Sequence, residues 1–309
     1  MKKNYECHNT IVCRKQIGVF IVSVFLFAIY SCAPTYDNLL RAVENDDRGK
    51  VLEILSTNPD LKHVPDNKNP LVKAVESNNR DMAKILLTHG IDVNIKVNGV
   101  DAVFYFLKDI EMMELFVKGG CDLRARDKTG YNILHWAIDN KMISLVKLII
   151  ESGGDVNEKV EDRRGFSPLM LAVESGSFEM VKMIGDAGAD VGAKSNNNNV
   201  PLLFILPWTK ETDLRQMAEY LLLKGADVNT RNEQNMTPLH FNARTTKYDY
   251  IKFLLEHGAD ANARDSYGNL AIDYTTYITK NYSEDFKVPE ENYKIRQEIE
   301  QLLRQYMSK

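Results

Sequence analysis

Residues 237–265 carry the clearest pattern of apolar and polar positions, and most segments after residue 36 repeat it imperfectly. Thr237 followed by Pro238 predicts a helix start, because the hydroxyl can accept a free backbone N–H and proline suits the first helical position. Apolar residues clustered from Tyr250 to Leu255 predict a second helix. Gly258 can adopt the left-handed conformation that ends a helix, and turn-forming residues follow it. The stretch therefore predicts two helices and a turn.

The helix-ending turn recurs at nearly constant intervals. Each copy has a glycine one or two positions before an aspartate, and these aspartates are Asp92, Asp122, Asp155, Asp190, Asp227 and Asp260, separated by 30, 33, 35, 37 and 33 residues. The helix-opening turn keeps the same phase, as in residues 167–169 and 237–239. A period near 33 residues indicates two-helix units that bury their apolar faces by stacking on one another.

The opening Thr-Pro-Leu-His at residues 237–240, the turn Gly-Ala-Asp-Val-Asn at residues 225–229 and the period together resemble ankyrin repeats. The resemblance covers residues 39–275, as about six full repeats after an N-terminal cap. It implies an all-α repeat solenoid of stacked antiparallel helix pairs, whose linking turns project as β-hairpin fingers. Residues 276–309 are expected to end in a C-terminal capping helix, with Ile299 and Leu303 on its apolar face and Arg296 on its polar face.

Some positions of this pattern are expected to build the stack. They are His135, Pro168, Gly188, Pro238, His240 and Gly258. The resemblance implies that the rings of His135 and His240 form hydrogen bonds across neighbouring loops. Asn242 stands where other units have Ala137 or Ala172, so a buried amide there would need a partner. The unit at residues 97–126 opens without proline or a Thr/Ser cap, and we expect it to be the least stable internal unit.

The first 31 residues are typical of a signal peptide. Four Lys or Arg residues precede a charge-free run of 13 residues at 17–29, whereas a membrane-spanning helix needs about 20. Residues 29–32, Ile-Tyr-Ser-Cys, resemble the lipobox of bacterial lipoproteins, in which the cysteine is diacylated and becomes the new N-terminus. Cys32 is therefore the expected lipid attachment site, residues 32–38 the tether, and the bacterial cell envelope the location. A cleaved, secreted or periplasmic protein and an uncleaved anchor are the alternatives.

The rest of the chain is acidic and lacks catalytic motifs. Residues 1–31 hold four basic residues and one acidic residue, which leaves 35 basic and 42 acidic residues and a net charge of −7. Such a surface repels phosphate backbones, so nucleic acid is not an expected partner. No phosphate loop, nucleophile elbow, zinc-type cysteine pairing or HExxH motif occurs, so no catalytic residue, metal or cofactor is expected. An enzymatic alternative would have to use residues 207–212 or 279–289, where no base is paired with a nucleophile.

A binding surface remains as the expected function. In ankyrin proteins the finger tips and the inner helix face contact protein partners. Carrying this over by position gives the candidates Lys128, Thr129, Tyr131, Arg163, Arg164, Phe166, Met236 and Tyr267. Aromatic and Arg side chains are typical interface anchors, although packing of these aromatics on neighbouring fingers stays open. We expect a non-enzymatic interaction scaffold that binds an unknown protein on its concave face; a structural or self-associating envelope protein is the alternative.

Overall fold

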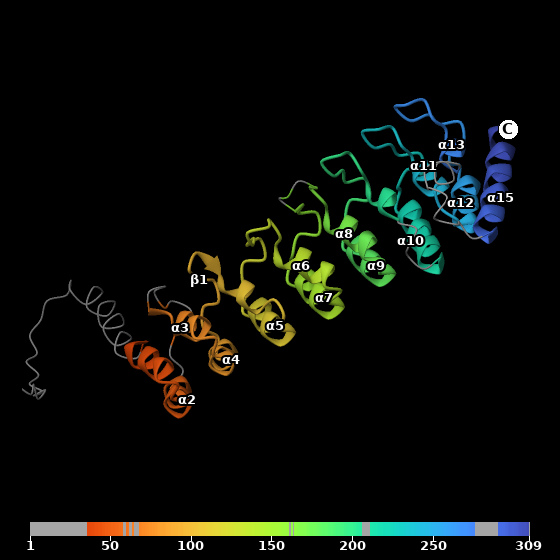
Figure 1. Cartoon of the computed structure of the whole chain (residues 1–309). Coiled ribbons are helices and arrows are strands. Elements are labelled where there is room, and N and C mark those ends of the chain that lie inside the picture. Colours follow the sequence, from red (N-terminus) through yellow and green to blue (C-terminus); the bar gives the residue numbers. More distant parts are fainter. Residues whose placement is uncertain are drawn as a thin grey trace, which may run out of the picture. The chain divides into compact units, whose positions relative to one another are not determined.

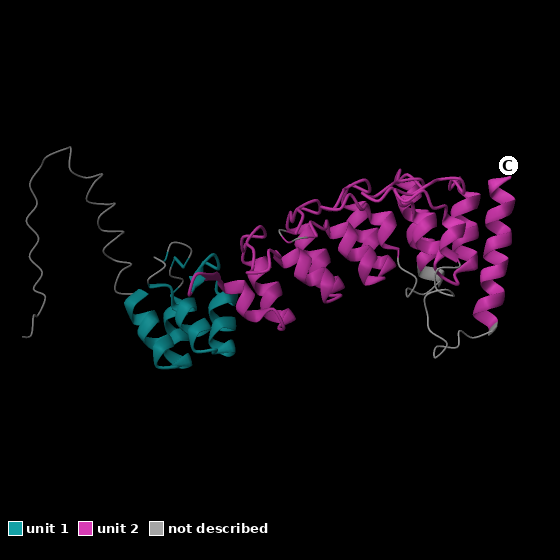
Figure 2. Ribbon diagram, turned by 45° about the horizontal axis from the view of Figure 1, so that its top comes forward, with its two compact units in different colours: residues 1–97 teal, residues 98–309 magenta. Residues whose placement is uncertain are grey.

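The computed structural model describes residues 36–57, 60, 61, 64, 68–160, 162, 164–205, 211–275 and 290–308, without the side chains of residues 211–213 and 290. The predicted signal peptide, Cys32, Arg163 and residues 207–210 and 279–289 lie outside the described residues. The chain divides into two compact units, residues 1–97 and 98–309, coloured separately in Figure 2.

The first unit is helical. Residues 36–44 are helical, and they include residues 36–38 of the range predicted as the tether. The following elements are α2 (Arg48–Ser56), α3 (Pro70–Glu76), α4 (Arg80–Thr88) and the short strand β1 (Lys96–Val97). Helix α3 begins after Asn69, whose side-chain oxygen accepts a hydrogen bond from the backbone N–H of Leu71 at 2.9 Å. Helices α3 and α4 pack together and bury Leu71 and Met82 completely.

The second unit is a series of helix pairs after strand β2 (Val100–Asp101). The first helices of its repeats are η2 (Ala102–Phe106), α6 (Ile133–Asp139), α8 (Pro168–Ser175), η3 (Pro201–Phe204), α11 (Pro238–Ala243) and α13 (Ala271–Thr275). The second helices are α5 (Ile110–Lys118), α7 (Ile143–Glu151), α9 (Phe178–Asp186), α10 (Glu211–Leu223) and α12 (Tyr248–Glu256). Figure 1 shows successive pairs side by side, with α6 against α8 and α7 against α9. Strands β1 and β2 are the only strands among the described residues, so this part of the chain is mostly helical.

The glycine turns close the second helices as the sequence predicts. Gly188 and Gly258 have φ angles of 94° and 89°, in the left-handed region that ends a helix. The carboxylate two residues later stabilises the turn, because Asp190 accepts the backbone N–H of Gly192 at 2.8 Å. Asp260 likewise accepts the backbone N–H of Asn262, at 2.8 Å.

Repeats that open without a capping side chain form tighter first helices. Asp101 and Val200 precede η2 and η3, and neither makes a side-chain capping bond; both helices are of the 3₁₀ type. By contrast, α8 follows Ser167, whose hydroxyl accepts the N–H of Met170 at 3.3 Å. Missing caps thus accompany the less favourable 3₁₀ geometry. The lower stability of the unit at 97–126 stays a prediction.

The last helix, α15 (Glu290–Met307), packs against α12 and α13. Ile299, Leu302 and Leu303 are buried there. Arg296, expected on the polar face, is only 8% exposed, and this expectation was wrong. It precedes Ile299 by three positions and Leu303 by seven, so it shares their face of the helix. Its Nε and Nη1 atoms have no hydrogen-bond partner among the described residues.

Candidate protein-binding face

Five finger loops of the second unit share one construction. They are residues 127–131, 162–166, 195–199, 232–236 and 265–269. A side-chain oxygen at the first position accepts backbone N–H groups of its own loop. Asp265, for example, accepts the N–H groups of Tyr267 and Asn269, each at 2.9 Å. The fourth position has a positive φ angle, as at Gly268 (82°). In the loop at 265–269 the N–H of Asp265 donates to the carbonyl of Asn269 at 3.0 Å, whereas the loop at 162–166 is closed by a bond from Val160 N to Phe166 O at 2.9 Å. These bonds hold each loop in one shape.

Four of the five fingers are also joined to one another through their backbones. The joining bonds run from Asn196 N to Arg164 O at 2.9 Å, from Glu233 N to Asn197 O at 3.3 Å and from Ser266 N to Gln234 O at 2.9 Å. We call the loops from 162–166 to 265–269 the finger row. Backbone pairing between loops fixes their spacing, so side chains on adjacent fingers can act on one ligand together.

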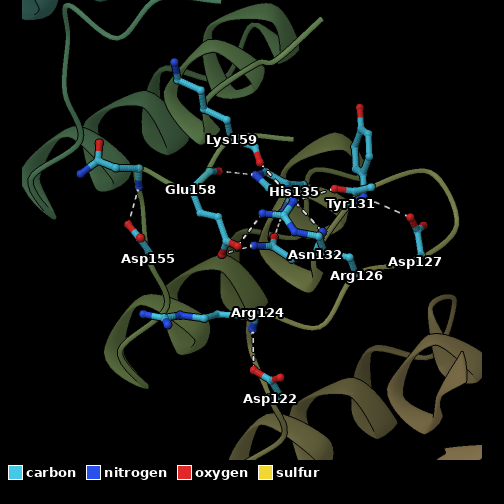
Figure 3. A network of polar contacts seen from close by, with 12 residues as sticks. Asp122, Arg124, Arg126, Asp127, Tyr131, Asn132, His135, Asp155, Glu158 and Lys159 are labelled. Carbon is cyan, nitrogen blue, oxygen red and sulfur yellow. Dashed lines mark hydrogen bonds and ion pairs between the residues drawn. The ribbon is translucent and has the colours of Figure 1, made fainter. Parts of the chain in front are cut away.

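The finger at 127–131 is joined to the next repeat by side chains instead (Figure 3). The guanidinium of Arg126 donates to the carbonyls of Gly130 and Lys159, at 2.8 and 3.1 Å. It also forms an ion pair with Glu158 at 2.5 Å. The other carboxylate oxygen of Glu158 accepts a bond from Asn132 at 3.0 Å. One partly buried cluster therefore connects two repeats.

His135 lies at the centre of this cluster and is fully buried. Its Nδ1 accepts the backbone N–H of Asn132 at 3.2 Å, so its Nε2 carries the proton and donates to the carbonyl of Glu158 at 2.6 Å. Burial and nearby Arg126 lower the pKa of His135 to about 4, despite the bond to Glu158. His240 repeats the arrangement, donating across its loop to the carbonyl of Asn269 at 3.3 Å. Burial likewise lowers the pKa of His240.

Tyr131, Arg164 and Phe166 contact one another between two adjacent fingers. The guanidinium of Arg164 donates to the hydroxyl of Tyr131 and lies 4.6 Å from the centre of the Phe166 ring. Phe166 is only 8% exposed and packs edge-on against Phe204 at 4.5 Å, so it offers little surface to a partner. Burial, followed by the nearby carboxylate of Asp139, raises the pKa of Tyr131 to about 12.

Three carboxylates surround Arg164. Its Nε lies 3.0 Å from Asp162 and its Nη1 lies 3.7 Å from Glu174. Partial burial acts against the charge of Asp162, but hydrogen bonds from Arg164 and Gly165 hold its pKa below the ordinary value. Burial raises the pKa of both Asp139 and Glu174, and each lies close enough to Arg164 for its positive charge to oppose the rise. The positive charge of Arg164 is therefore paired with carboxylates of the protein itself.

At the other end of the finger row, Met236 and Tyr267 line one open hollow of about 400 Å³. Its remaining lining residues are Arg244, Asn269, Asp273 and Tyr274. Tyr267 is 78% exposed, whereas the hydroxyl of Tyr274 turns inward and donates to Asp265. The volume is within the range of ligand pockets, and the lining combines aromatic, thioether and charged groups.

The remaining sequence candidates lie apart from this hollow. Lys128 is exposed at a finger tip, and the hydroxyl of Thr129 donates to Asp127 at 2.6 Å. Reasoning from the fingers alone missed Asp139, Glu174 and Arg244, although all three stand seven positions after the helix-opening residue of their repeats. Alignment of the first helices by the repeat period would have found them.

The described residues contain no group of three or more His, Cys, Asp or Glu side chains that could hold a metal ion. No helix in the described part of the chain has the length and apolar character needed to span a membrane. The free thiol of Cys121 is buried, and burial raises its pKa to about 12, so it stays protonated at neutral pH.

Comparison with known proteins identifies the repeats. Models of ankyrin repeats match residues 66–95, 101–195 and 221–274, which together make up more than half of the chain. An ankyrin repeat protein of fowlpox virus is 34% identical over 266 residues, covering 77% of this chain and 49% of the relative. One from Acanthamoeba polyphaga mimivirus is 23% identical over 213 residues, covering 67% and 24%. One from Borreliella burgdorferi is 37% identical over 70 residues, covering 22% and 17%. The chain thus spans less than half the length of each of these relatives.

Proposed function

Because this chain belongs to the ankyrin-repeat family, we propose that it is a non-enzymatic scaffold that binds a protein partner along its finger loops and first helices. Ankyrin repeats are generally interaction modules, and the three relatives named above are described only as ankyrin repeat proteins. The bound face corresponds to the concave face expected from the sequence. The partner is a protein that the repeat pattern does not name.

One observation carries the proposal. The finger row is held by backbone bonds within and between loops, and at its end the predicted anchors Met236 and Tyr267 share one hollow. A rigid row with a partly apolar hollow and an exposed aromatic side chain has the features of an interface hot spot, where a few anchors supply most of the binding energy.

A photo-crosslinking amino acid at position 267 tests this function in cells that produce the full chain. We expect irradiation to yield adducts with a partner protein. The matched control carries the same amino acid at Leu223, which is 85% exposed at the end of second helix α10, away from the fingers. No adduct at 267, or the same adducts at both positions, would contradict binding by the fingers. An adduct only with a second copy of the chain would favour the self-associating alternative.

We also propose that the chain is exported and tethered by a lipid on Cys32 to a bacterial membrane, in the inner or outer leaflet. The charge-free run before Cys32 and the lipobox-like residues 29–32 support this proposal. Two or more acyl chains anchor a protein stably, since each buried CH₂ contributes roughly 0.8 kcal/mol. Mass spectrometry of the N-terminal peptide should find an acylated Cys32, and Cys32→Ala should release the protein from membranes. An unmodified mass would favour the secreted or periplasmic alternative.

A further inference from the structure

The same four repeat positions occur at two places on the binding face, three repeats apart. At the first place they hold Tyr131, Asp139, Arg164 and Phe166. At the second place the corresponding residues, in the same order, are Met236, Arg244, Tyr267 and Asn269. The second set supplies four of the six residues that line the hollow. The two places differ in where they carry charged side chains.

At the first place the protein supplies its own cation. Arg164 reaches from the finger, bonds to the hydroxyl of Tyr131, lies over Phe166 and pairs with Asp162 and Glu174. The helix position is acidic there, because it holds Asp139. The cation, the aromatic ring and the carboxylates all belong to the protein, so their charges already neutralise one another in part.

At the second place the cation stands on the helix instead of the finger, and the finger position carries no charge of opposite sign. The helix position holds a cation, Arg244, and the finger position holds the uncharged Tyr267. Arg244 is exposed, and its guanidinium makes no hydrogen bond or ion pair with any of the described residues. Among the described lining residues the one carboxylate is that of Asp273, which accepts the backbone N–H of Leu270 at 2.8 Å at the start of its own helix.

From this comparison we propose that the hollow receives an acidic side chain of a bound polypeptide, with Arg244 as its ion-pair partner. The aliphatic and aromatic walls, Met236 and Tyr267, would contact an apolar residue beside that carboxylate. A guanidinium binds a carboxylate with two parallel hydrogen bonds, and the arrangement would mirror the internal pairing of Arg164 with Glu174. The inference rests on the proposed function and adds the chemistry of the partner segment.

Phage-displayed random peptides selected on the full-length protein test this inference. We expect the selected peptides to be enriched in Asp or Glu next to an apolar residue. Arg244→Ala should weaken their binding by about tenfold or more, because a charge-assisted hydrogen bond is lost. Arg124→Ala removes the same charge from an exposed helix-ending turn outside the hollow and should leave the affinity within about twofold. Selection on Arg244→Glu should return peptides rich in Lys or Arg.

A second variant uses the repeat comparison directly. Tyr267→Glu places a carboxylate at the position that corresponds to Arg164, where it can pair with Arg244 and exclude the peptide. Binding of acidic peptides should fall, while Tyr267→Phe should retain it. Peptides without acidic enrichment, no binders at all, or equal binding to the Arg244→Ala and Arg124→Ala variants would overturn the inference. The crosslinks at position 267 are a separate measurement, so an interaction scaffold with a different partner chemistry would still be recognised.

Discussion

Arg126 Nη2 lies 2.5 Å from Glu158 Oε1, and this ion pair joins two consecutive repeats. The two side chains are only 19% and 18% exposed. Arg126 also donates hydrogen bonds to the carbonyls of Gly130 and Lys159, and Glu158 also accepts one from the side chain of Asn132. Removing either member would leave several polar groups in a largely dry place without partners.

We expect Arg126→Ala to lower the free energy of unfolding by about 2 kcal/mol. Breaking a fully buried ion pair costs about 3–5 kcal/mol, and the remaining exposure reduces this cost. Urea denaturation followed by circular dichroism measures the change, and a double-mutant cycle with Glu158→Ala should show positive coupling. Lys147→Ala is the control, because its pair with Glu151 is 3.8 Å long and exposed. Equal losses in both variants would show that the Arg126 pair contributes no more than a surface pair.

The buried ring of His135 should make stability depend on pH. Its pKa is about 4 when folded, below the 6.5 of a free histidine, so between these values the unfolded chain binds a proton that the folded chain does not. Stability is therefore complete above about pH 6.5 and is lost as the pH falls towards 4, by up to about 3 kcal/mol at roughly 1.4 kcal/mol per pKa unit.

Thermal or urea unfolding of the wild type and of His135→Gln across this pH range checks the effect. The variant is expected to be less stable at neutral pH but to lose less stability on acidification. His89→Gln serves as the control, because His89 is exposed at the end of a second helix. Parallel pH profiles for wild type and His135→Gln would exclude His135 as the source of the acid sensitivity.

Replacing Arg296 is expected to raise the free energy of unfolding, whereas replacing Arg126 lowers it. Its side chain is 8% exposed, and two of its nitrogen atoms are buried without partners among the described residues. Because an unsatisfied buried polar group costs about 1–3 kcal/mol, Arg296→Met should raise the free energy of unfolding by about 1–2 kcal/mol. Differential scanning calorimetry measures the shift in Tm. Arg304→Met, at an exposed position of the same helix, should change it little; a lower Tm for Arg296→Met would show that the guanidinium stabilises the fold.

Local patterns were sufficient to predict the repeats, because their caps and turns use neighbouring residues. The structure confirms two examples, the helix cap Ser167 before Pro168 and the left-handed Gly258. The hollow is different, since it combines side chains from two repeats, and no local pattern places Arg244 beside Tyr267. The face of α15 was misjudged at Arg296 because its charge was taken to mean a polar position, although its spacing from Ile299 and Leu303 places it on the buried face. Contacts between stacked repeats depend on side chains about 23 to 33 positions apart, such as Arg244 and Tyr267, which the repeat period relates but no local pattern does.

Asn242 was expected to need a partner for its buried amide, and in the described part of the chain only one end of that amide has one. The residue is 2% exposed, and its Nδ2 donates to the carbonyl of Pro238 at 2.9 Å, but its Oδ1 is buried without a partner among the described residues. Asn242→Ala gives this position the residue found at Ala137 and Ala172. The change removes an unsatisfied oxygen, worth about 1–3 kcal/mol, but loses one hydrogen bond and some packing.

We therefore expect Asn242→Ala to raise the free energy of unfolding by about 1 kcal/mol, measured by urea denaturation. The reciprocal variant Ala172→Asn places an amide in a fully buried site and should lower it by about 2 kcal/mol or more, through overpacking and an unsatisfied polar group. A stability loss in Asn242→Ala as large as that in Ala172→Asn would mean that the amide has a second partner in solution, such as a buried water bound to Oδ1.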